Sequence, residues 1–161
     1  MASKMHVGIN GLGRIGRLAL RVAVEKGITV AAVNDRNDLA QLLPLIKRDS
    51  IYGPFSAGVD GDDLVVAGMT IPVFRNQPFP DWGALGVDVL LECAGGNPDG
   101  SRAREHLKAG AKAVIISAPA PNVDATLIMG VNEGDYNPAR HKVVSMASCT
   151  ANCVGPVLKV L

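Results

Sequence analysis

Short apolar runs alternate along the chain with segments whose apolar residues recur at helical spacing. The first run covers residues 6–9, and the segment after it places apolar side chains three or four positions apart from Ile15 onward. The arginine and glutamate side chains of this segment fall on another face, which predicts an amphipathic helix that ends near Gly27. Residues 29–33 form a second apolar run that leads to Asp35. The pattern therefore predicts a complete strand–helix–strand unit by residue 35.

The same alternation returns in the second half of the chain. Apolar runs at residues 87–92 and 113–116 flank a helical segment at residues 101–109, and further strand candidates follow at residues 127–130 and 142–145. Parallel strands that are covered on both faces by crossover helices produce this pattern. The predicted fold class is therefore α/β, with a doubly wound, mostly parallel sheet.

Two segments between these units depart from the pattern. Residues 38–47 predict a helix with Asp38 as its N-cap, which Pro44 shortens or kinks. Residues 56–74 consist of short alternating pieces separated by glycines, which is typical of antiparallel strands. We therefore expect an antiparallel hairpin insertion after the second helix.

Composition and charge exclude several classes of protein. The 161 residues are 48% hydrophobic and 19% charged, as in ordinary globular domains. The formal net charge of +1 is too small for the basic field that attracts nucleic acids or anionic membranes. The sequence shows no signal peptide, no apolar stretch of about 18 residues, and no disulfide or metal-binding pattern among its cysteines. His6, His106 and His141 lie far apart, and we expect each to be a surface or core residue. We predict a soluble, cytoplasmic protein that binds no metal, nucleic acid or membrane.

A glycine-rich sequence follows the first predicted strand and opens the first predicted helix. Gly11, Gly13 and Gly16 have the spacing of a dinucleotide-binding turn. In such a turn the first glycine allows a tight bend, the second lets the backbone approach a pyrophosphate, and the third lets helix and strand pack closely. The helix N-terminus adds unpaired N–H groups and about half a positive charge. The spacing alone also fits a plain glycine-rich turn, but its place between strand and helix favours dinucleotide binding.

Asp35 strengthens this prediction. It ends the second predicted strand 19 residues after Gly16, near the spacing of roughly 20 at which an acidic residue accepts hydrogen bonds from the adenosine ribose. A carboxylate at this place repels the 2′-phosphate of NADP, so NAD is the predicted cofactor. Arg36 follows directly and has the charge to attract that phosphate, which makes the preference for NAD incomplete.

The last helical segment begins at a cysteine. Cys149 follows a strand candidate, and Ser148 is placed as the N-cap of the helix. A thiol at a helix N-terminus is stabilised as the nucleophilic thiolate, whereas a cysteine beside an apolar helix is otherwise a small buried hydrophobe. Cys153, one turn further along, fits the second description. The chain ends at Leu161 inside this segment, so we expect further polypeptide to follow.

In five stretches the sequence resembles glyceraldehyde-3-phosphate dehydrogenase, in the order that the family has them. The stretches are residues 7–17, 33–35, 114–119, 129–133 and 148–153. The resemblance covers essentially the whole chain, but only the first half of a typical family member. It implies a Rossmann-type NAD-binding domain over residues 1–148 and the start of the catalytic domain over residues 149–161.

The resemblance also implies functional residues and a reaction. Cys149 is the nucleophile, Ser148 and Thr150 help hold the substrate or the attacking phosphate, and the NAD site includes Arg14, Ile15, Asp35 and Ser117 beside the three glycines. In the family a homotetramer oxidises glyceraldehyde 3-phosphate in glycolysis, through a cysteine thioester that inorganic phosphate cleaves. The second half of the family's polypeptide supplies the histidine that activates the cysteine. The resemblance therefore implies that this chain alone is inactive.

Three positions depart from the family's pattern. Ala151 stands where the family usually has the second of two threonines after the cysteine, Ala94 replaces a hydroxyl residue near the cofactor, and Gln77 stands where an arginine is common. These changes bear on cofactor affinity and substrate identity more than on the fold. The alternatives that share the motifs are a relative that uses erythrose 4-phosphate or NADP, and a non-catalytic NAD-binding module.

Overall fold

The computed structural model describes residues 5–96 and 98–161. The main strands are β1 (His6–Asn10), β2 (Thr29–Asp35), β8 (Val73–Arg75), β9 (Val89–Glu92), β10 (Ala113–Ile116), β11 (Ala125–Thr126) and β12 (Val143–Ser145). The helices are α1 (Arg14–Glu25), α2 (Leu39–Lys47), α3 (Gly100–Lys108) and α4 (Cys149–Val160), with one 3-10 turn, η1 (Glu133–Asp135). None of these helices, within the described part of the chain, has the length and apolar character needed to cross a membrane.

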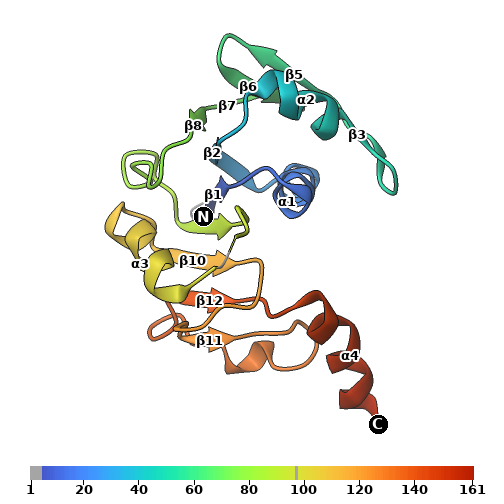
Figure 1. Cartoon of the computed structure of the whole chain (residues 1–161), viewed down its shortest axis with the longest axis vertical. Helices are drawn as coiled ribbons and strands as arrows, with labels where there is room; N and C mark the ends of the chain where they lie inside the picture. Colours follow the sequence, from blue (N-terminus) through green and yellow to red (C-terminus); the bar gives the residue numbers. More distant parts are fainter. Residues whose placement is uncertain (1–4, 97) are drawn as a thin grey trace.

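The seven main strands form one parallel sheet in the order β11-β12-β10-β9-β1-β2-β8, which can be followed from bottom to top in Figure 1. The order reverses between β1 and β9, because the chain builds outward to β8 first and then to the other side. Right-handed crossovers therefore place the helices of the two halves on opposite faces. Val7 and Ile9 of β1 belong to a core with residues of α1 and α2, whereas Leu90 of β9 packs in a second core with Ala103 of α3. The predicted doubly wound fold is confirmed.

The antiparallel insertion is a separate three-stranded sheet that joins the core of α2. Its strands are β5 (Ala57–Asp60), β6 (Asp63–Val66) and β7 (Met69–Ile71), and a two-strand pair, β3 (Arg48–Asp49) with β4 (Gly53–Pro54), precedes it. The prediction that the insertion extends to Phe74 is wrong, because β8 pairs in parallel with β2. Pro72 has no N–H to donate, and its carbonyl accepts the N–H of Val33 at 3.0 Å. This contact directs the chain back to the main sheet.

The strand predicted at residues 127–130 is also wrong, since β11 lies two residues earlier. Asn132 accounts for the difference: its Oδ1 accepts the Ile128 N–H at 2.8 Å and its Nδ2 donates to the Thr126 carbonyl at 3.0 Å. The Val131 N–H also donates to the Ile128 carbonyl. These local bonds use backbone groups that a strand would offer to a neighbour. The chain therefore turns toward η1.

The predicted helix over residues 38–47 is present as α2, but its start is built differently. Asp38 occupies the N-cap position without making a side-chain cap bond. Its Oδ1 instead pairs with Nη1 of Arg75 at 3.0 Å, which links α2 to the end of β8. Pro44 lies inside the helix, which ends at Lys47. The cap residue thus serves a tertiary contact.

Candidate cofactor cleft and nucleophile

An open cleft of about 530 Å³ lies at the carboxyl ends of β1, β2 and β9. This is where the strand order reverses, and open α/β sheets bind their ligands at such points. Its walls include Gly11, Leu12, Gly13, Asp35, Arg36, Ala94, Gly95 and Gly96. The structure therefore brings the glycine turn and the acidic residue of the predicted motif to one cleft.

The three glycines of the motif have different surroundings. Gly11 has a φ of +92°, and a Cβ on it would collide with the backbone of Ala94. A Cβ on Gly16 would overlap the carbonyl oxygen of Gly11, so α1 packs directly on the turn. Gly13 is the N-cap of α1 and has no atom within 4 Å of the place where a Cβ would stand. Gly11 and Gly16 thus permit close packing, while Gly13 leaves room for a ligand beside the first turn of α1.

Asp35 faces the glycine turn and is 8% exposed. Its Oδ2 accepts the Leu12 N–H at 2.7 Å, and its Oδ1 accepts the backbone N–H and the side-chain amide of Asn37 at 2.8 and 2.9 Å. A carboxylate offers about four acceptor positions, so about one remains for a ligand hydroxyl. This arrangement is compatible with the predicted contact to a ribose.

Gly16 and three other residues predicted to contact the cofactor do not line the described cleft. Arg14 and Ile15 are exposed on the first turn of α1, and Ser117 follows β10, where its N–H donates to the Glu92 carbonyl at 3.0 Å. Their contacts with NAD stay predictions. Ser117 is also hydrogen bonded to the thiol of Cys93. Burial raises the pKa of Cys93 to about 11, and this hydrogen bond offsets only part of the effect, so Cys93 is a neutral thiol.

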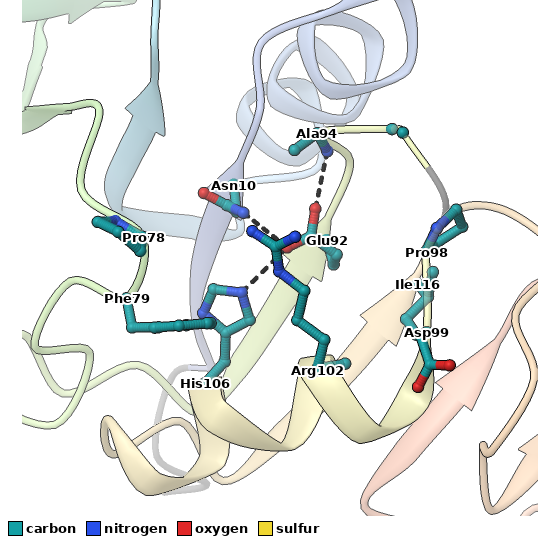
Figure 2. Close-up of a pocket in the computed structure, with 13 residues that line it drawn as sticks. Asn10, Pro78, Phe79, Glu92, Ala94, Pro98, Asp99, Arg102, His106 and Ile116 are labelled. Atoms are coloured by element: carbon teal, nitrogen blue, oxygen red, sulfur yellow. Dashed lines mark hydrogen bonds and ion pairs between the residues drawn. The ribbon is translucent and has the colours of Figure 1, made fainter.

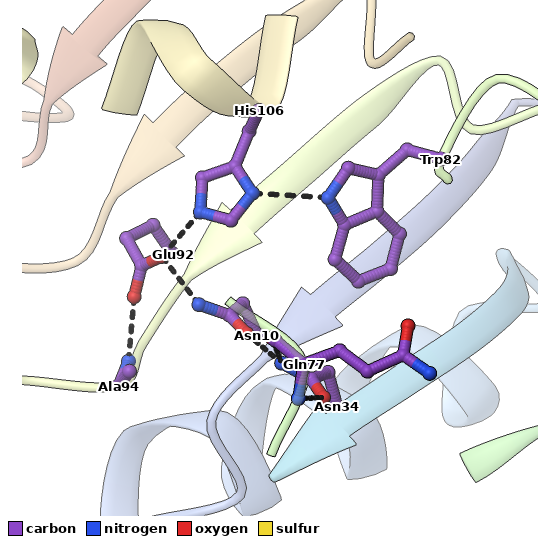
Figure 3. A network of polar contacts seen from close by, with 7 residues as sticks. All are labelled: Asn10, Asn34, Gln77, Trp82, Glu92, Ala94 and His106. Carbon is purple, nitrogen blue, oxygen red and sulfur yellow. Dashed lines mark hydrogen bonds and ion pairs between the residues drawn. The ribbon is translucent and has the colours of Figure 1, made fainter. Parts of the chain in front are cut away.

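A polar network that the sequence analysis missed joins the ends of three strands beneath the cleft (Figure 3). Nδ2 of Asn34 donates to Oδ1 of Asn10 at 2.6 Å and to the Gln77 carbonyl at 2.8 Å. Nδ2 of Asn10 in turn donates to Oε2 of Glu92 at 2.6 Å, and Oε1 of Glu92 accepts the Ala94 N–H at 2.8 Å. The only signal for this network in the sequence was the presence of polar residues at the ends of three buried strands.

His106 connects this network to the only tryptophan of the chain. His106 was expected in the core or on the surface; it is 3% exposed and lies between Trp82 and Glu92. The indole N–H of Trp82 donates to Nδ1 at 3.0 Å, so Nδ1 carries no proton and Nε2 donates to Oε2 of Glu92 at 3.0 Å. Burial acts to raise the pKa of Glu92, but hydrogen bonds from His106, Asn10 and Ala94 outweigh it and hold that pKa below its usual range. Glu92 is therefore ionised at neutral pH.

A small pocket of about 90 Å³ adjoins the cleft (Figure 2). Asn10, Glu92 and His106 lie along it, and the side chain of Arg102 extends from α3 toward Glu92. The ring of Phe79 meets His106 edge-on, with 4.9 Å between the ring centroids. Asn10 and Arg102 line both the pocket and the cleft. The polar network therefore borders both spaces.

Cys149 lies at a strand–turn–helix junction. After β12 the chain turns through Ala147, which has a φ of +58°, and α4 then begins at Cys149, which is exposed. Oγ of Ser148 accepts the Ala151 N–H at 2.9 Å, which confirms the predicted N-cap. Nδ2 of Asn152 donates to the Met146 carbonyl at 2.7 Å and secures the turn. The cysteine is held at the N-terminus of α4 by its neighbours.

Cys149 and the cofactor cleft lie at the same edge of the sheet, because all seven strands are parallel. Only β10 and β9 separate β12 from β1. Three interstrand spacings of about 4.8 Å place the two sites on the order of 14 Å apart along this edge. Ser148, Cys149 and Thr150 are not among the described residues that line the cleft. An extended ligand is needed to bridge the two sites.

Comparison with known proteins agrees with this geometry. The family model described as "Glyceraldehyde 3-phosphate dehydrogenase, NAD binding domain" matches residues 5–99, more than half of the chain. The chain belongs to the glyceraldehyde-3-phosphate dehydrogenase family. NAD is the cofactor of this domain, and the open space beside Gly13 and the position of Asp35 suit it.

Curated members of the glyceraldehyde-3-phosphate dehydrogenase family resemble the chain along nearly its whole length. The enzyme of Geobacillus stearothermophilus is 48% identical over an alignment 163 residues long, which covers 98% of this chain and 48% of the relative. Glyceraldehyde-3-phosphate dehydrogenase 2 of Streptomyces avermitilis is 47% identical, covering 98% of this chain and 49% of the relative. The chain thus spans about half the length of the curated relatives it matches.

Proposed function

We propose that the chain forms the cofactor-binding and nucleophile-bearing half of a phosphorylating glyceraldehyde-3-phosphate dehydrogenase. Cys149 is the nucleophile, residues 1–148 are the NAD-binding domain and residues 149–161 begin the catalytic domain. The observation that carries the proposal is the capped, exposed Cys149 at the N-terminus of α4, on the edge of the sheet that holds the cofactor cleft. In this proposal the enzyme is a cytoplasmic homotetramer of glycolysis.

The same proposal assigns the NAD contacts. The first N–H groups of α1, at Arg14 and Ile15, have no acceptor within the helix. They lie at the positive end of the helix dipole and would face the pyrophosphate of the bound cofactor. Gly11, Gly13 and Gly16 allow this approach, and Asp35 accepts a hydroxyl of the adenosine ribose. Ser117 contacts the cofactor from the end of β10. When bound, NAD supplies the acceptor for a hydride.

The chemistry of the chain centres on the thiolate of Cys149. Its sulfur adds to the aldehyde carbon as the C=O π bond opens, and the new oxyanion takes a proton from the protonated base, which makes a hemithioacetal. The C–H bond then breaks and its electron pair leaves with the hydride, while the hydroxyl proton goes to a base, which leaves a thioester. An oxygen of inorganic phosphate attacks the thioester carbon, the C–S bond breaks and the thiolate is restored. Ser148 and Thr150 flank Cys149 in the sequence, and their hydroxyls help hold the substrate or the phosphate.

We expect the purified chain to bind NAD but to oxidise glyceraldehyde 3-phosphate negligibly. The reason is that the family's second half supplies the histidine base that takes the hydroxyl proton. Formation of reduced nicotinamide, followed by absorbance with phosphate present, measures this rate against the full-length Geobacillus stearothermophilus enzyme. A rate comparable to that of the relative would contradict the expectation.

We also expect iodoacetamide to alkylate Cys149 about tenfold faster than Cys153 at neutral pH. The prediction that Cys153 is a small buried hydrophobe is wrong, because its thiol is exposed at the surface of α4. Accessibility therefore does not separate the two thiols, but only Cys149 lies at the helix N-terminus where a thiolate is favoured. Peptide mapping by mass spectrometry gives both rates in one sample. Equal rates would argue against Cys149 as the nucleophile and would favour the non-catalytic NAD-binding module.

A further inference from the structure

Glu92 ends β9, next to β1, at the point where the strand order reverses. Two walls of the cofactor cleft meet there: the glycine turn after β1 and residues 94–96 after β9. The walls touch directly, since the Cys93 N–H donates to the Asn10 carbonyl at 2.7 Å and a Cβ on Gly11 would strike Ala94. The width of the cleft therefore depends on the groups that join these two segments.

The carboxylate of Glu92 also connects these two segments. Its Oε2 accepts from Asn10, the residue before the glycine turn, and its Oε1 accepts the N–H of Ala94 in the opposite wall. A third donor, Nε2 of His106, reaches Oε2 from α3, as Figures 2 and 3 show. One side chain thus receives hydrogen bonds from both walls and from the helix behind them.

We propose that Glu92 is a positioning residue of the cofactor cleft, whose carboxylate holds the glycine turn and residues 94–96 at the separation that NAD requires. Glu92 acts through Asn10 and Ala94. The role relies on NAD as the cofactor and is independent of the chemistry assigned to Cys149.

The three donors require an acceptor on both oxygens of residue 92. Nε2 of His106 cannot become an acceptor instead, because Nδ1 accepts the Trp82 indole N–H and the ring proton is therefore on Nε2. Glutamine has the same size but offers one oxygen and one NH2 group. In one orientation the amide oxygen accepts from Asn10 and His106, and the NH2 group faces the N–H of Ala94, so two donors oppose each other. In the other orientation the oxygen accepts from Ala94, and the NH2 group faces the donors of Asn10 and His106. Either orientation releases one wall of the cleft.

Glu92→Gln is therefore expected to weaken NAD binding by about tenfold. The matched control is Glu105→Gln on α3, where the glutamate forms a surface ion pair with Lys108 at 2.7 Å. We expect the control to stay within about twofold of the unaltered chain. Isothermal titration gives Kd and thermal unfolding gives Tm for each variant. A lower Tm for Glu92→Gln with an unchanged Kd would show a purely structural role and overturn the proposal.

A second variant tests the contact itself by exchanging donor and acceptor. In Asn10→Asp with Glu92→Gln, the new carboxylate accepts from the new amide, and its other oxygen still accepts from Asn34. Nε2 of His106 then faces the new NH2 group, so the rescue is partial. Asn10→Asp alone brings two carboxylates to the 2.6 Å contact and is expected to bind NAD most weakly. We expect the double variant to bind NAD at least about threefold more tightly than Asn10→Asp alone. Additive losses would overturn the proposal, and an unaltered chain that binds no NAD would overturn the cofactor assignment and this role together.

Discussion

Replacing Gly16 with alanine is expected to lower the free energy of unfolding by about 3 kcal/mol. The added methyl group would overlap the carbonyl oxygen of Gly11, and that carbonyl is held by the tight turn against Ala94. Relief requires α1 to move away from the turn, which disturbs the core around Val7 and Ile9. Urea unfolding followed by circular dichroism measures the change.

Gly13→Ala is the matched control for this substitution. Gly13 has a φ of −65° and no neighbour near the place of a Cβ. We therefore expect the free energy of unfolding of the variant to change by less than about 1 kcal/mol. The new methyl group would stand in the cleft, however, and should weaken NAD binding. The two alanine variants are thus expected to separate stability from cofactor affinity, and equal losses of stability would contradict the geometry of the turn.

Asp35→Ala is expected to weaken NAD binding by about a hundredfold. It removes the acceptor proposed for the ribose and also leaves the N–H of Leu12 and the amide of Asn37 without their partner. NADP binding should fall less, because the carboxylate that repels the 2′-phosphate is lost while Arg36 remains. Isothermal titration with each cofactor measures both changes.

Asp38→Ala provides the control for Asp35→Ala. Its side chain is 63% exposed and pairs with Arg75, and it does not line the described cleft. We expect NAD to bind this variant as it binds the unaltered chain. Equal heats from Asp35→Ala and the unaltered chain would remove Asp35 from the site.

The parts that the sequence could predict are those with local causes. The glycine spacing implied a strand, a turn and a helix because Gly16 packs on the carbonyl of Gly11, five residues earlier, whereas the contact of Gly11 with Ala94 is distant in the sequence. The cap at Ser148 was also predictable, since its partner, Ala151, is three residues away. The apolar alternation predicted the two faces of the sheet, although it placed β8 in the antiparallel insertion and β11 two residues late.

The pairings within the polar network could not be predicted from the polar residues at the strand ends, because the partners are distant in the sequence. Asn10 and Glu92 are 82 residues apart, and only the reversal of strand order makes β1 and β9 neighbours. His106 was expected in the core or on the surface, but nothing in the sequence indicated that it receives an indole N–H and donates to Glu92. The errors at β8 and β11 have a related cause, since one backbone contact at Pro72 and one side chain, Asn132, decide where those strands lie.

Trp82 gives the molecule an optical reporter of its own. It is the single tryptophan, it is fully buried, and its indole is bonded to the residue that also holds Glu92. Tryptophan emission overlaps the absorption band of reduced nicotinamide, so a reduced cofactor in the neighbouring cleft is placed to quench it by resonance energy transfer. Native fluorescence can thus follow occupancy of the cleft without any attached dye.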